Sequence, residues 1–139
     1  MNDVAVRTGL IALLCSVGIF FGIAFAESPP NAANNSTLTF AVLVGDWTRT
    51  QGPYVISIRA VDDNGTLDAR YANPNALPFH RAEAIRDGNA LKLYFELRSG
   101  GYGGSTYVLN YDAATDSLRG IYDQVVLKQK FDVVFKRTK

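Results

Sequence analysis

Apolar and polar residues alternate along most of the chain after residue 53, and this period of two limits the fold more than any other feature. In the run 91–97, for example, Leu91, Leu93, Phe95 and Leu97 alternate with lysine, tyrosine and glutamate. Such a run gives a β-strand one apolar and one polar face, as in antiparallel sheets that cover a core on one side. Because no segment has a convincing helical period, the sequence predicts an all-β protein.

Short turn segments separate the alternating runs. The pair Asn64-Gly65 lies between two of them and is the strongest short hairpin signal. A second segment, Asn75–Phe79, is predicted to form a short turn. The whole pattern predicts eight strands: Phe40–Arg49, Tyr54–Val61, Thr66–Ala72, Phe79–Arg86, Ala90–Arg98, Ser105–Tyr111, Ser117–Val125 and Gln129–Arg137.

Eight consecutive strands in an open sheet would leave two exposed edges. Closure into an up-and-down barrel removes both edges, so we expect an eight-stranded antiparallel barrel. The interior of such a barrel is filled by side chains or holds one small ligand. The outward positions carry charges, among them Arg59, Asp68, Lys92 and Glu96, which would be costly against lipid. We therefore expect a soluble barrel and not an outer-membrane barrel.

The first 26 residues have the pattern of a secretory signal peptide. Arg7 precedes an uncharged apolar run from Leu10, and the run ends in the small-x-small site Ala24-Phe25-Ala26. We expect cleavage before Glu27, a secreted or periplasmic protein and no membrane insertion after cleavage. The alternative is an uncleaved anchor, because the apolar run has about 17 residues, the lower limit for crossing a bilayer.

Composition excludes several classes of function for the rest of the chain. Residues 27–39 are polar and rich in Pro, Asn and Ser, which predicts a flexible lead-in before a barrel domain over residues 40–139. Without the signal peptide, 13 basic and 12 acidic residues remain, a balance that favours no nucleic-acid partner. The only cysteine, Cys15, lies in the signal peptide. One cysteine and one histidine cannot form a Cys/His zinc site, and no cofactor is predicted.

Tyrosines are the main candidates for a binding site, because several fall on faces predicted to point inward. A buried tyrosine needs a partner for its hydroxyl, and apolar pockets with a few convergent polar groups are typical of ligand sites. The predicted ligand-binding residues, which would form a neutral hydrogen-bonding pocket, are Tyr54, Tyr71, His80, Tyr107, Tyr111, Tyr122 and Gln124. The alternative is that the tyrosines are ordinary core residues.

Three further positions carry predictions. The sequence places no serine, cysteine or carboxylate beside His80, the only histidine, so no catalytic residue is predicted and the protein is not expected to be an enzyme. Gly120, inside a predicted strand, indicates a bend or a close backbone approach. The glycine-rich segment 100–104 predicts a mobile hairpin tip with Tyr102 exposed, a suitable place for contact with another protein.

Two short motifs resemble those of small secreted barrels. Gly45-Asp46-Trp47 lies in the first predicted strand, and the last strand ends in Phe135-Lys136-Arg137. This pair resembles the calycins, in which lipocalins have a Gly-x-Trp in the first strand and a basic residue near the last strand packs over that tryptophan. Together with residues 64–71, Gly45-Asp46-Trp47 also looks like the first hairpins of avidin-type barrels. This chain has a single tryptophan, however, where avidin pockets use several.

A second resemblance concerns the segment before the first strand. Ser36–Phe40, ahead of Gly45-Asp46-Trp47, is similar to the N-terminal segment of secreted bacterial metalloprotease inhibitors, which are small barrels that usually carry a disulfide.

From the predicted barrel and its inward tyrosines, we expect a non-enzymatic barrel that binds a small ligand in a tyrosine-lined lumen. The alternative is a protein-interaction or protease-inhibitor barrel that uses the N-terminal segment and the loops.

Overall fold

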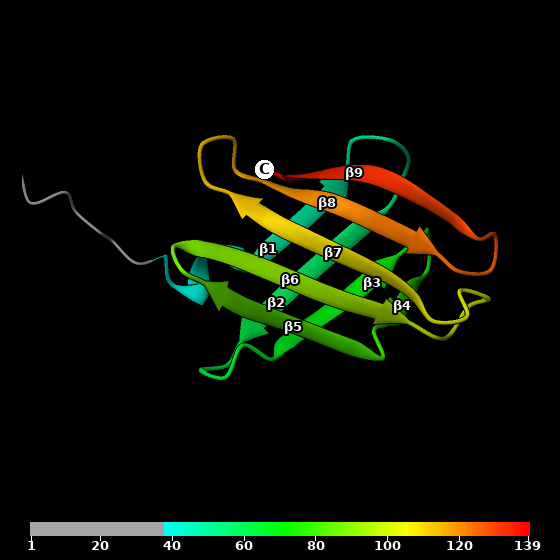
Figure 1. Cartoon of the computed structure of the whole chain (residues 1–139), viewed down its shortest axis with the longest axis horizontal. Helices are drawn as coiled ribbons and strands as arrows, with labels where there is room; N and C mark the ends of the chain where they lie inside the picture. The colour runs from blue at the N-terminus through cyan, green and yellow to red at the C-terminus, as the bar shows by residue number, and fades with distance from the viewer. Residues whose placement is uncertain (1–37) are drawn as a thin grey trace, which may run out of the picture. The chain divides into compact units, whose positions relative to one another are not determined.

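The computed structural model describes residues 38–139, so the predicted signal peptide and the lead-in before Leu38 lie outside the described residues. Nine strands form one antiparallel sheet in the order β4-β3-β2-β1-β9-β8-β7-β6-β5 (Figure 1). The all-β prediction is confirmed. The strands are β1 (Gly45–Arg49), β2 (Val55–Val61), β3 (Leu67–Ala72), β4 (Ala76–Pro78), β5 (Arg81–Asp87), β6 (Ala90–Leu97), β7 (Ser105–Asp112), β8 (Ser117–Gln124) and β9 (Gln129–Arg137). Residues 38–139 contain no helix that is long and apolar enough to cross a membrane.

Two of the predicted elements are wrong in part. The strand predicted over Phe40–Arg49 begins only at Gly45, because Phe40–Leu43 forms a short 3-10 helix, η1. This turn buries Leu43 completely and aims its carbonyl oxygen at Trp47, whose indole Nε1 donates a hydrogen bond to it at 2.9 Å. The turn predicted over Asn75–Phe79 contains the ninth strand, β4, which pairs with β3. Pro78 fits there because β4 is an edge strand.

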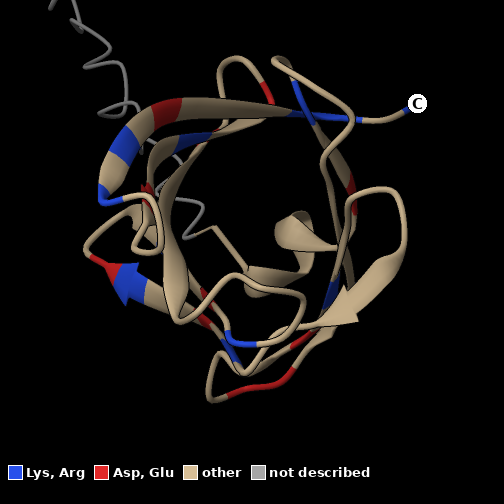
Figure 2. Cartoon of the chain, turned by 90° about the vertical axis from the view of Figure 1, so that its right-hand side faces the viewer, with Lys and Arg blue, Asp and Glu red and all other residues tan. Residues whose placement is uncertain are grey.

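The sheet curls so far that its two halves face each other (Figure 2). Across the seam between the halves, Thr66 and Glu83 form an isolated bridge, and the amide of Ala84 donates a hydrogen bond to the carbonyl oxygen of Gly65 at 2.6 Å. Glycine is required at position 65, because a Cβ atom there would lie 2.0 Å from the Ala84 oxygen. The sheet is therefore a half-barrel whose halves touch at this short seam, so the eight-strand count and the full closure predicted from the sequence are not confirmed.

The predicted alternation determines which side chains enter the core. In β6, all four predicted inward residues are at most 1% exposed, and Tyr107 and Leu109 of β7 are fully buried. The close approach predicted at Gly120 is confirmed, because a Cβ atom there would lie 2.0 Å from the carbonyl oxygen of Val108 on β7.

Arg137 of β9 fixes one end of the sheet. Its guanidinium carbon lies 4.2 Å from the centre of the Trp47 ring, and its nitrogens donate hydrogen bonds to the carbonyl oxygens of Val42 and Val44 at 2.6 and 2.7 Å. It also donates to the carboxylate of Asp116 at 2.7 Å, and this bond lowers the pKa of that carboxyl. Arg137 thereby joins the first and last strands, η1 and the β7–β8 turn.

Candidate functional site

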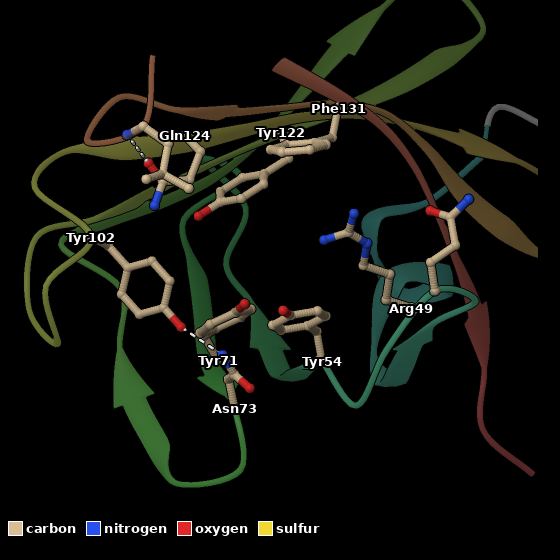
Figure 3. Close-up of a pocket in the computed structure, with 10 residues that line it drawn as sticks. Arg49, Tyr54, Tyr71, Asn73, Tyr102, Tyr122, Gln124 and Phe131 are labelled. Carbon is tan, nitrogen blue, oxygen red and sulfur yellow. Dashed lines mark hydrogen bonds between the residues drawn. The ribbon is translucent and has the colours of Figure 1, made fainter. Parts of the chain in front are cut away.

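A pocket of about 300 Å³ lies at the end of the sheet opposite η1, among the β1–β2, β3–β4, β6–β7 and β8–β9 connections (Figure 3). Strands supply half of its residues, and the neighbouring connections supply the other half. The lining residues are Arg49, Gln51, Tyr54, Tyr71, Asn73, Tyr102, Tyr122, Gln124, Leu127 and Phe131.

Aromatic rings form two walls that face each other across this pocket (Figure 3). In the first wall, Tyr54 stacks on Tyr71 with ring centres 6.2 Å apart and planes 13° from parallel. In the second wall, Tyr122 stacks on Phe131 with ring centres also 6.2 Å apart. The ring of Tyr102 meets Tyr71 edge to face at 5.6 Å and closes one side. The pocket thus has the shape of a slot that suits a flat group.

Tyr107 lies in the core and packs against one tyrosine of each wall, Tyr71 and Tyr122. It is fully buried, its ring stacks on Tyr122 at 4.3 Å, and its hydroxyl oxygen lies 3.4 Å from that of Tyr71. Burial raises the pKa of Tyr71 and of Tyr107 above the usual range of a phenol, and it raises the pKa of Tyr122 as well. These hydroxyls therefore remain protonated at neutral pH and can donate hydrogen bonds.

Two polar contacts at the pocket leave donors available. The side-chain oxygen of Gln124 accepts a hydrogen bond from the amide of Leu127 at 2.8 Å, so its NH₂ group remains available to the pocket (Figure 3). The hydroxyl oxygen of Tyr102 accepts a hydrogen bond from the NH₂ group of Asn73 at 2.9 Å, which leaves the hydroxyl proton free to donate elsewhere.

Arg49, the last residue of β1, brings into the pocket the only charged side chain that the described residues contribute to its lining. Its guanidinium carbon lies 5.1 Å from the centre of the Tyr54 ring, and its Nε is buried without a hydrogen-bond partner. Among residues 38–139, no acidic side chain forms an ion pair with it, and no aspartate or glutamate lines the pocket. The neutral pocket predicted from the sequence is therefore wrong, because the lining carries one positive charge.

The structure brings four of the seven predicted site residues to this pocket: Tyr54, Tyr71, Tyr122 and Gln124. Tyr107 is the core residue that packs against both walls. Tyr111 lies near the opposite end, where its ring meets Trp47 edge to face at 6.0 Å and its hydroxyl donates to Asp116 at 3.1 Å.

His80 is exposed and contributes instead to a shallow hollow with Phe79 and Arg98. It was predicted to point into the lumen because His80, Ala82 and Ala84 would share one face of a continuous strand. In the structure Phe79 turns inward, with its ring centre 4.7 Å from that of Phe95, and β5 begins only at Arg81. The alternation is interrupted at His80, which leaves this side chain outside.

Sequence reasoning missed six lining residues: Arg49, Gln51, Asn73, Tyr102, Leu127 and Phe131. The signal for Arg49 was present, because alternation along β1 places it on the same face as the buried Trp47. Tyr102 was predicted to be exposed. It is instead half-buried, because its ring packs on Tyr71 and its hydroxyl accepts the hydrogen bond from Asn73.

Comparison with known proteins finds no matching family model, no similar curated protein and no similar solved structure. Within residues 38–139 there is also no group of three His, Cys, Asp or Glu side chains that could hold a metal ion. The geometry of the pocket is therefore the basis on which a function can be inferred.

Proposed function

We propose that this protein is a non-enzymatic, secreted or periplasmic binding barrel that holds a small ligand in the slot between the two aromatic walls. The observation that carries the proposal is the pocket itself, an aromatic-lined space of about 300 Å³ with a few convergent polar groups. Ligand sites typically have this composition, and the volume of this pocket is at the lower end of their usual range. The lining consists of aromatic rings, amides, one leucine and one arginine, groups that bind and orient a ligand.

Contacts at the opposite end of the sheet lead us to propose a calycin-type scaffold. Gly45-Asp46-Trp47 lies in the first strand, and a basic residue of the last strand, Arg137, stacks over that tryptophan at 4.2 Å. This is the contact that the resemblance implies. A scaffold fixed at one end holds the strand ends at the other, and a protein with pre-positioned walls loses less conformational entropy when a ligand binds.

Binding of the neutral dye N-phenyl-1-naphthylamine, whose fluorescence rises in apolar surroundings, tests this proposal. We expect saturable binding and chemical-shift changes confined to the backbone amides around the pocket in ¹H–¹⁵N spectra. Tyr54→Leu removes one stacking surface and should weaken binding about threefold to tenfold, in line with the energy of aromatic pairs. The matched control is Tyr94→Leu, since this half-buried tyrosine is not part of the pocket lining.

The proposal predicts that the control variant binds the dye as the wild type does. Absence of saturable binding would contradict it, as would equal losses in the two variants. The dispersion of the ¹H–¹⁵N spectrum of each variant establishes that the fold is kept.

A further inference from the structure

We infer that the ligand carries a carboxylate on a flat, unsaturated body, with the carboxylate paired to Arg49. This inference rests on the proposed function and specifies the chemistry of the same pocket. It follows from the unpaired charge of Arg49, from the direction of the polar groups and from the shape of the walls.

The first observation behind this inference is that the charge of Arg49 has no acidic partner within residues 38–139. Burying a polar or charged group without a partner is unfavourable, and buried charges are normally paired. Arg137 shows the usual arrangement, with two carbonyl oxygens and one carboxylate around its guanidinium. Arg49 has no such partner within residues 38–139 although its Nε is buried. A planar guanidinium with free N–H groups matches a carboxylate, which can accept two parallel hydrogen bonds.

The other polar groups point to the same chemistry. Gln124 uses its oxygen on the Leu127 amide, and Tyr102 uses its oxygen as the acceptor for Asn73, so both present N–H or O–H donors. Tyr54 and Tyr122 add two more hydroxyls to the lining. Donors around an arginine, with no carboxylate among the lining residues, favour an acceptor-rich and negatively charged group.

The aromatic walls favour a ligand whose anionic group is attached to an apolar body over a free inorganic anion. Tyr54 with Tyr71, and Tyr122 with Phe131, offer ring faces on two sides of the slot (Figure 3). A free inorganic phosphate would leave these faces without a partner. A flat conjugated body between them gains stacking and apolar burial while its carboxylate reaches Arg49.

A matched pair of probes separates charge from shape. The probes 2-naphthoate and 2-naphthamide share the ring system and the carbonyl group, and they differ in the negative charge. We expect isothermal titration calorimetry to show 2-naphthoate binding at least about tenfold more tightly than 2-naphthamide, the ratio that corresponds to about 1.4 kcal/mol. Inorganic phosphate should show no saturable binding in the same range.

Arg49→Met should abolish the preference, so that the two probes bind with similar affinity, whereas Arg49→Lys should keep part of it. The control is Arg119→Met, which removes an equal charge from an exposed side chain outside the pocket lining and should leave the preference intact. Binding of N-phenyl-1-naphthylamine by each variant reports whether the pocket is still formed.

The two proposals fail in different ways. If the dye binds but the two naphthalene probes bind equally, or if Arg49→Met keeps the preference, the carboxylate inference is overturned and pocket binding stands. If neither the dye nor either probe shows saturable binding, both proposals are rejected.

Discussion

At the scale of single residues, two arginines near opposite ends of the half-barrel have contrasting surroundings. Each guanidinium lies over an aromatic ring, Arg137 over Trp47 and Arg49 over Tyr54. Arg137 is hydrogen-bonded to two backbone carbonyls and to Asp116, whereas Arg49 has no hydrogen-bond partner for its buried Nε. The first arrangement stabilises the fold, and the second leaves an arginine available to a ligand.

The two arginines should therefore differ in their effect on stability. Arg137→Met removes hydrogen bonds from a charged donor and should lower the free energy of unfolding by about 3 kcal/mol. Arg49→Met removes an unpaired buried polar group along with a weak contact to Tyr54, so the free energy should change by less than about 1 kcal/mol. Urea unfolding followed by fluorescence measures both changes, and equal losses would contradict the assignment of these roles.

At the scale of elements, alternation predicted most strands because each buries one face. It identified β6 and β7 almost to the residue. It failed where a segment is irregular or too short to repeat. The three residues of β4 hold one inward side chain, Leu77. The short turn η1 is held by its contacts with Trp47 of the adjacent β1 and with Arg137 of the last strand, β9.

The candidate site was predictable only in part for the same reason. Tyr54, Tyr71 and Tyr122 follow strand periodicity, but Asn73, Tyr102 and Leu127 lie in connections whose paths depend on the packed sheet. The error at His80 arose at a strand start, where Phe79 takes the inward position. Loop residues carry no period, so only the folded chain shows that they meet at one pocket.

The β7–β8 pair gives a prediction at this scale. Gly120→Ala would place a Cβ atom 2.0 Å from the carbonyl oxygen of Val108, which is backbone and cannot move aside without disturbing the ladder. We expect a loss of about 3 kcal/mol, at the upper end of the range for overpacking. Gly88→Ala is the control: it has no neighbour within 4 Å but a φ of +60°, and should lose about 1 kcal/mol. Thermal unfolding measures both, and a smaller loss at Gly120 would contradict the close approach.

At the scale of the whole described domain, the curled sheet combines a seam, a fixed end and an open end. Edge strands expose backbone groups that have no partner in the sheet. Across the seam, the amide of Ala84 in β5 donates a hydrogen bond to the carbonyl oxygen of Gly65. The amides of Ala82 and Arg86 point from the same edge of β5, because amide direction alternates along a strand, but they donate no such bond within residues 38–139.

Hydrogen exchange tests this description of the seam. We expect the amide of Ala84 to exchange more slowly than the amides of Ala82 and Arg86, because only Ala84 is hydrogen-bonded across the seam. Exchange rates read residue by residue from ¹H–¹⁵N spectra provide the comparison. Equal protection of the three amides would indicate a continuous ladder and therefore a fully closed barrel.

The central claim is that the aromatic slot at the open end holds a small carboxylate ligand against Arg49. A crystal structure of the protein with 2-naphthoate tests it most directly. We predict density for the naphthalene ring between the wall of Tyr54 and Tyr71 and the wall of Tyr122 and Phe131, with a carboxylate oxygen within hydrogen-bond distance of the Arg49 guanidinium. Density for the compound elsewhere, or in the slot with its carboxylate directed away from Arg49, would contradict the claim.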